Sequence, residues 1–233
     1  MQIERQNFSR IGTMTSLFES ACERGYDQFV ELSRQIKERG NPEYDPELDE
    51  MRLSRDIAGV QTIVFSGMCF ESAIYEYAAD HLGDAYVRDH LDKLDVLSKW
   101  IVVMRLVMDY EFRKDQAPYS SLRDLISARN KLVHSKSEPL DFGNLQEQIN
   151  RLMKAEEKYY LSVHNAYRAI VLVSMDLEDK IGAVNNPLPS FNPTVSPLRD
   201  VPKNLEKTLS DCRLMLSRSK KAGTVHEETE KRS

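Results

Sequence analysis

Apolar residues recur with the period of an α-helix along almost the whole chain, and no segment alternates convincingly with the period of a β-strand. Only 9 of the 233 residues are glycine, so few positions interrupt these patterns. With 41% hydrophobic residues, a chain of this length can bury one sizeable core. The sequence therefore predicts an all-α fold, in which amphipathic helices pack their apolar faces into a bundle.

Turn-forming residues divide these patterns into about five main helices. The first four are expected over residues 14–38, 47–82 and 90–110, and from a cap at Ser120 or Ser121 to about His134. The fifth is expected over 145–181. Gly83 and Gly182 follow two of the long patterns directly, as glycine often does at the end of a helix.

The chain is expected to have three segments. Residues 1–46 form an N-terminal helix and loop, residues 47–182 form the helical core, and residues 183–233 form a proline-rich C-terminal extension. Five of the nine prolines lie between residues 183 and 202, which favours an extended linker or a strap across the surface. A short helix over 203–219 and a charged, disordered end from about residue 220 complete the prediction.

Charge, cysteine content and the N-terminal sequence exclude several classes of function. A net charge of −5 excludes a wholly basic nucleic-acid-binding surface, although it leaves room for a local basic groove. The three cysteines, Cys22, Cys69 and Cys212, fit neither a disulfide framework nor a metal site, and no HExxH motif occurs, so we expect no metal and no cofactor. The apolar runs are too short to span a bilayer and the N-terminus lacks a signal-peptide pattern. We therefore expect a cytoplasmic protein with no membrane partner.

One short stretch carries the chemistry. Arg129, Asn130 and His134 place a permanent cation, an amide and a titratable imidazole within one and a half helical turns. At about 100° per residue, Arg129 falls in the middle of an apolar arc, and Asn130 and His134 share its flank. The arc is formed by Leu122, Leu125, Ile126, Leu132 and Val133. A charge on such a face requires a partner, because burying an unpaired charge is costly.

The helix expected over 47–82 offers that partner. Glu71 lies near the centre of its apolar stripe, so two helices each place one charge on an apolar face, with opposite signs. We predict that Glu71 and Arg129 meet directly or through one water. The alternative to a functional role is an ion pair that only fixes the register of the two helices.

The stretch Ser127-Ala128-Arg129-Asn130-Lys131-Leu132-Val133-His134 resembles the Arg-polar-x3-His motif of HEPN domains. These are all-helical domains found in toxin–antitoxin, abortive-infection and CRISPR-associated ribonucleases. Phe70-Glu71-Ser72-Ala73 on an early core helix and Lys99-Trp100 on the next helix also resemble several families of that group. The resemblance covers about residues 55–180.

The resemblance implies a metal-independent endoribonuclease whose active site contains Arg129, Asn130 and His134, usually across a two-fold dimer, with Glu71 in support. It further implies an RNA substrate, a homodimer and a toxin or phage-defence role beside an antitoxin or another defence partner. In one subgroup an antitoxin modifies a tyrosine two residues after the histidine. This chain has Lys136 there, which adds positive charge near Lys131.

General acid–base chemistry is consistent with these residue types. RNA supplies its own nucleophile, the 2′-hydroxyl, so cleavage needs a base, an acid and cationic donors for the phosphate charge. Histidine titrates near neutrality and arginine can bind phosphate through two N–H groups. The base and the acid act on opposite sides of the phosphorus, so one imidazole cannot serve as both in one step. Two imidazoles facing each other across a dimer can. Water or Lys136 could also act as the acid.

Two other readings stay open. The chain could be a non-catalytic HEPN-like helical module that binds RNA, a nucleotide or a protein partner, or a purely structural part of a larger assembly. His164 is expected to be a core histidine rather than a ligand. Core packing is likewise the expected use of Tyr159, Tyr160 and Tyr167, although their rings could stack on bases.

Overall fold

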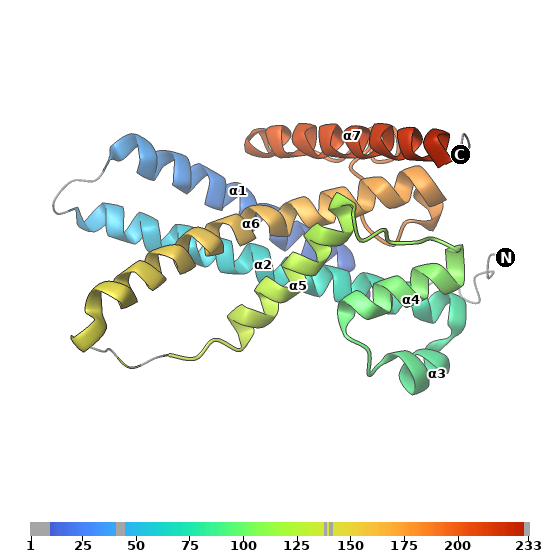
Figure 1. Cartoon of the computed structure of the whole chain (residues 1–233), viewed down its shortest axis with the longest axis horizontal. Helices are drawn as coiled ribbons and strands as arrows, with labels where there is room; N and C mark the ends of the chain where they lie inside the picture. Colours follow the sequence, from blue (N-terminus) through green and yellow to red (C-terminus); the bar gives the residue numbers. More distant parts are fainter. Residues whose placement is uncertain (1–9, 41–44, 138, 140–141, 231–233) are drawn as a thin grey trace.

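The computed structural model describes residues 10–40, 45–137, 139 and 142–230. Within these residues all regular elements are helical and no strand occurs, so the all-α prediction is confirmed. The two longest helices, α2 (Pro46–Leu82) and α6 (Leu145–Ile181), pass through the middle of the molecule (Figure 1). Helix α1 (Thr15–Arg39) lies along α2, and α5 (Ala117–Val133) packs against α6.

The remaining elements lie at the ends of this framework. Helix α4 (Val96–Met108) packs on α2, and α7 (Glu206–Glu230) packs on α6. A short helix α3 (Asp84–Tyr86) and a π-helical turn η1 (Val87–Leu91) connect α2 to α4. Three 3₁₀ turns occupy η2 (Phe142–Asn144), η3 (Ala183–Asn185) and η4 (Lys203–Leu205).

Three helix ends differ from the prediction, each for a local reason. Helix α4 begins at Val96 rather than near residue 90, because the Asp95 carboxylate accepts the backbone N–H of Ser98 at 3.0 Å and caps the helix there. Helix α5 begins at Ala117 with Pro118 in its first turn, so Ser120 and Ser121 lie inside the helix rather than at its cap. The backbone of α7 remains helical to Glu230 instead of ending near residue 219.

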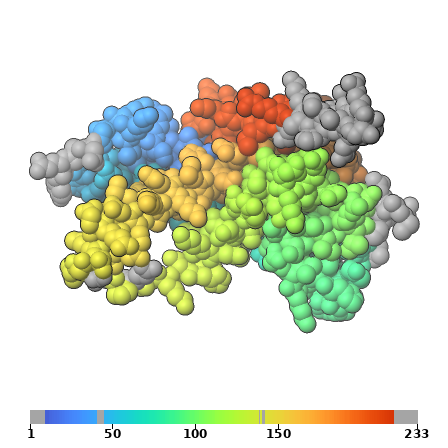
Figure 2. All heavy atoms as spheres, viewed as in Figure 1, coloured from blue at the N-terminus to red at the C-terminus, as the bar shows by residue number. Residues whose placement is uncertain are grey.

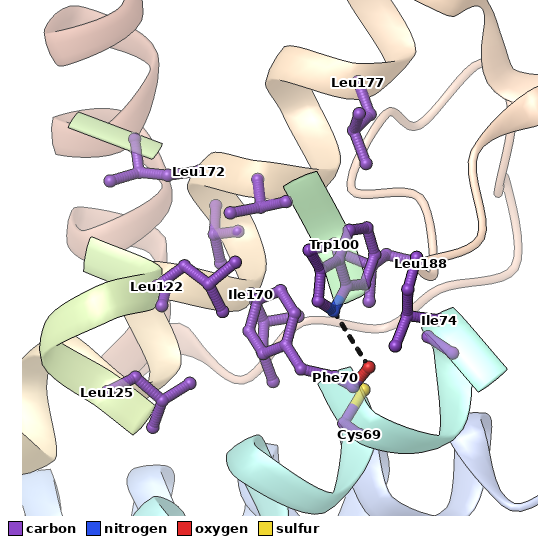
Figure 3. Packing of buried hydrophobic residues seen from close by; sticks show 14 of the residues in the cluster. Cys69, Phe70, Ile74, Trp100, Leu122, Leu125, Ile170, Leu172, Leu177 and Leu188 are labelled. Atoms are coloured by element: carbon purple, nitrogen blue, oxygen red, sulfur yellow. Dashed lines mark hydrogen bonds between the residues drawn. The ribbon is translucent and has the colours of Figure 1, made fainter. Parts of the chain in front are cut away.

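One hydrophobic cluster receives residues from each of the three predicted segments. Tyr26 comes from α1, Trp100 from α4, Phe191 from the proline-rich region and Leu209 from α7. The indole N–H of Trp100 donates to the carbonyl oxygen of Phe70 at 3.0 Å, and their rings meet edge to face (Figure 3). The core therefore ties α4 firmly to α2, the two helices beside the candidate site.

The proline-rich region crosses the surface and is anchored in the core. Leu188 and Phe191 are buried, and the Ser174 hydroxyl donates to the carbonyl oxygen of Pro189 at 2.7 Å. Arg199 forms ion pairs with Glu19 and Glu23 of α1. These contacts describe a strap that joins α6 to α1, which is one of the two forms predicted for the region.

His164 and Tyr167 pack in the core as expected, whereas Tyr159 and Tyr160 are only partly buried. The Nδ1 atom of His164 lies 2.9 Å from the Tyr26 hydroxyl, and its ring meets the Phe29 ring edge to face. Tyr167 is fully buried. Burial, and next the charge of Arg168, lower the pKa of His164.

Helix α2 is the one helix of the described residues that is long and apolar enough to cross a membrane. More than half of its most apolar stretch, 56%, is buried inside the protein. Core helices and membrane spans share this composition, so the helix is weak support for a membrane location.

Candidate functional site

Arg129 lies in the last turns of α5, where this helix crosses α2. Gly67 of α2 makes the close crossing possible, because a Cβ atom there would lie 3.0 Å from the Cγ atom of Arg129. The aliphatic stem of the arginine thus covers the backbone of α2. Its Nε atom is shielded from solvent and has no hydrogen-bond partner within the described part of the chain.

The guanidinium group itself reaches the surface. Its Nη2 atom lies 3.5 Å from Oε2 of Glu71, and its Nη1 atom donates to Oδ1 of Asn130 at 3.2 Å. The predicted meeting of Glu71 and Arg129 is therefore confirmed as a direct contact. The side chains remain 48% and 29% exposed respectively, so this is a partly solvated pair and not a buried one.

The exposure of this pair predicts a small contribution to stability. A double-mutant cycle with Glu71→Gln and Arg129→Gln should give a coupling free energy of about 0.2–1 kcal/mol by denaturant unfolding, as for other solvated ion pairs. A pair that existed to fix helix register would give several kcal/mol. The cycle thus separates the structural role from a chemical one.

A cavity of about 290 Å³ opens beside the guanidinium, between α2, α4 and α5. Its charged lining residues are two cations and three carboxylates: Arg129, Lys99, Glu71, Asp92 and Asp95. Each carboxylate has a partner, since Asp92 lies 3.6 Å from Lys99 and Asp95 caps α4. The hydrogen bonds from the Ser98 hydroxyl and backbone N–H lower the pKa of Asp95.

The other predicted site residues lie outside this cavity. His134 follows α5 as its C-terminal cap residue and is exposed, and its backbone N–H donates to the carbonyl oxygen of Asn130 at 3.0 Å. No hydrogen bond joins its imidazole to Arg129 in the described residues. Lys131 and Lys136 are also exposed. The structure thus brings together Glu71, Arg129 and Asn130, and it leaves His134 accessible to a ligand or a second copy.

Lys99 also belongs to the site, although the Arg-polar-x3-His motif does not contain it; the Lys99-Trp100 pair carries part of the family resemblance. Its side chain is mostly buried, and it faces the same cavity as Arg129. Trp100 fills the core on the neighbouring position and so holds α4 in place. Among the described residues, no group of three or more His, Cys, Asp or Glu side chains is arranged to hold a metal ion.

Comparisons with models of protein families, with curated proteins and with solved structures found no match to this chain. The relation to HEPN domains therefore stays a prediction from the motif.

Proposed function

We propose that this protein is a metal-independent endoribonuclease of the HEPN type, acting in the cytoplasm. The observation that carries the proposal is the accessible guanidinium of Arg129, held by Glu71 and Asn130 beside a cavity, with the exposed His134 directly after the same helix. The weak ion pair leaves Arg129 free to exchange a carboxylate for a phosphate, because both side chains already contact water.

The proposed reaction is an attack by the 2′-hydroxyl on the adjacent phosphorus. His134 removes the hydroxyl proton as general base, or protonates the leaving 5′-oxygen as general acid. Arg129 donates to the phosphate oxygens, and Asn130 orients the imidazole or contacts the phosphate. The products would be a 2′,3′-cyclic phosphate and a free 5′-hydroxyl group, and Lys131 and Lys136 would add positive charge for the substrate.

A homodimer would supply the second imidazole. The first half of α6 follows the motif closely in the chain and exposes several large apolar side chains, which are Leu145, Ile149, Leu152 and Met153. Exposed apolar surface of this kind is typical of an interaction surface. A mechanism with two imidazoles requires a second copy of the chain on this surface. An antitoxin or another defence partner would compete with that copy for the surface.

A second candidate function is a non-catalytic HEPN-like module that binds RNA, a nucleotide or a protein. The position of His134 favours it, because the imidazole lies outside the cavity of Arg129 and no hydrogen bond orients it toward that residue in the described chain. Binding without cleavage would then be the only activity of the motif.

The test is an assay of the purified full chain with mixed RNAs in EDTA. We expect cleavage to persist in EDTA and to produce cyclic phosphate ends. A 2′-deoxy sugar at the cleavage position should prevent the cut, because it lacks the 2′-hydroxyl. Arg129→Ala should reduce the rate strongly, and Arg129→Lys should restore little because lysine lacks the two-pronged contact. RNA that is bound but left intact by the wild-type chain would instead support the non-catalytic module.

A further inference from the structure

A second hollow lies on the other side of α5, between α5 and the first half of α6. Its volume is about 610 Å³, within the range of ligand-binding sites. Figure 2 shows an open notch between the end of α5 and the first half of α6. We call this hollow the α5–α6 groove, and its floor and walls include Ile63, Leu132, Tyr159, Leu161, Ser162 and Asn165.

Three positively charged side chains line this groove. Lys131, Lys158 and Arg168 line it, and none of the three has an ion-pair partner among the residues that the structure describes. The single acidic residue of the lining, Asp124, is already paired with Arg123 at 2.8 Å. The chain as a whole is acidic, so this local excess of positive charge marks a place that would attract an anion.

Arg168 is the cation among these three that has a buried nitrogen without a hydrogen bond in the described chain. Its side chain is partly buried, and its Nε atom is shielded from solvent without a hydrogen-bond partner in the described chain. Its positive charge also acts on its neighbours, since it lowers the pKa of His164 in addition to the effect of burial. A partly buried cation in this state gains free energy when an anion binds beside it.

The lining of the groove includes one aromatic ring, that of Tyr159, which follows Lys158 on α6. The Tyr159 hydroxyl donates to the carbonyl oxygen of Asp56 at 2.6 Å, which holds the ring in place. Gly59 provides the space, because a Cβ atom there would collide with that hydroxyl. A fixed aromatic face beside cations is the combination that single-stranded nucleic acids use, with bases stacked on rings and phosphates held by positive charge.

The groove and the Arg129 cavity occupy opposite faces of α5. Ser127, Lys131 and Ser135 face the groove, whereas Ile126, Arg129 and Asn130 face the cavity. At about 100° per residue, His134 falls between these faces, beside Ser127 and Asn130. A strand that runs from one hollow to the other around the end of α5 would therefore pass over the imidazole.

We propose that the α5–α6 groove holds the phosphodiester backbone of a single-stranded RNA next to the scissile phosphate, with Lys131, Lys158 and Arg168 as its phosphate ligands. The inference rests on the proposed ribonuclease function for the position of the cut, but binding in the groove requires no cleavage. Lys158 and Arg168 thus become positioning residues that lie outside the motif.

The test measures binding of a fluorescent 2′-O-methyl single strand, which cannot be cleaved, by anisotropy at several salt concentrations. Lys158→Gln changes an exposed residue, so folding should be preserved, and Lys154→Gln on the same helix but outside the groove is the control. Lys158→Gln should weaken binding about tenfold, as expected for one charge-assisted contact. It should also reduce the slope of log K against log salt by about 0.7, whereas Lys154→Gln should change neither quantity.

Three results would overturn the groove proposal: an unchanged slope in Lys158→Gln, an equal loss in Lys154→Gln, or competition by AMP as strong as that of the strand. The outcome is independent of catalysis. If the wild-type chain binds the strand through Lys158 but cuts no RNA, the groove proposal holds and the proposed ribonuclease function is refuted. If RNA is cut, Lys158→Gln should raise KM with little change in kcat, as a positioning residue would.

Discussion

Replacing His134 with alanine is expected to lower the rate of RNA cleavage by roughly 10²–10⁴-fold, the usual contribution of a general acid or base. His134 is exposed at the end of α5, so the substitution should change the free energy of unfolding by only about 0.5 kcal/mol. Single-turnover cleavage of a labelled RNA, measured beside circular-dichroism unfolding, separates loss of chemistry from loss of fold.

The control is His90→Ala, because His90 is also an exposed histidine but lines neither the Arg129 cavity nor the α5–α6 groove. This variant should cleave at the wild-type rate. Wild-type cleavage by His134→Ala would refute the catalytic assignment. An excess of His134→Ala chains mixed with wild type should also suppress activity per wild-type chain, provided that subunits exchange, because two imidazoles then have to meet at one phosphate.

Replacing Arg199 with methionine is expected to destabilise the protein by about 3–5 kcal/mol, the usual result of removing one partner from a buried ion pair. Glu19 and Glu23 are mostly buried and would lose the cation that pairs with both. The loss is a large share of the total stability of about 5–15 kcal/mol of a typical domain. Urea unfolding followed by circular dichroism measures it.

The matched control is Arg34→Met on α1, where the arginine also pairs with two glutamates but is well exposed. Its cost should stay below about 1 kcal/mol. Equal costs for the two variants would contradict the role assigned to the strap. Adding Glu19→Gln to Arg199→Met should recover part of the loss, because it removes one of the unpaired charges.

The Arg199 deficit should also depend on pH. Burial raises the pKa of Glu19 above its ordinary value of 4.5 even with Arg199 in place, and the missing cation should raise it further. A raised pKa means that the folded chain binds the proton more tightly than the unfolded chain. The ionised Glu19 carboxylate therefore lowers the free energy of unfolding fully at pH values above its folded pKa, and this loss disappears at pH values below its unfolded pKa. Relative to wild type, Arg199→Met should therefore lose more stability at pH 7 than near pH 4.

Local pattern was sufficient to predict most of the helices. Apolar period and flanking glycines placed α1, α2 and α6 to within a residue or two, because helix formation follows from contacts three and four positions apart. The same logic was wrong at α4 and α5, where Asp95 and Pro118 set the helix starts through cap chemistry that competes with the apolar pattern.

The sequence by itself determined the all-helical architecture, because amphipathic helices have to bury their apolar faces. It also predicted the contact of Glu71 with Arg129 from the opposite charges on two neighbouring helices. Only the tertiary structure decided how exposed that pair is: the stem of Arg129 lies against Gly67, and the guanidinium reaches the surface. The tertiary structure also places Lys131, Lys158 and Arg168 around one groove, which the sequence did not predict. Which faces of α5 and α6 become neighbours depends on long-range packing, and no periodicity within one helix contains that information.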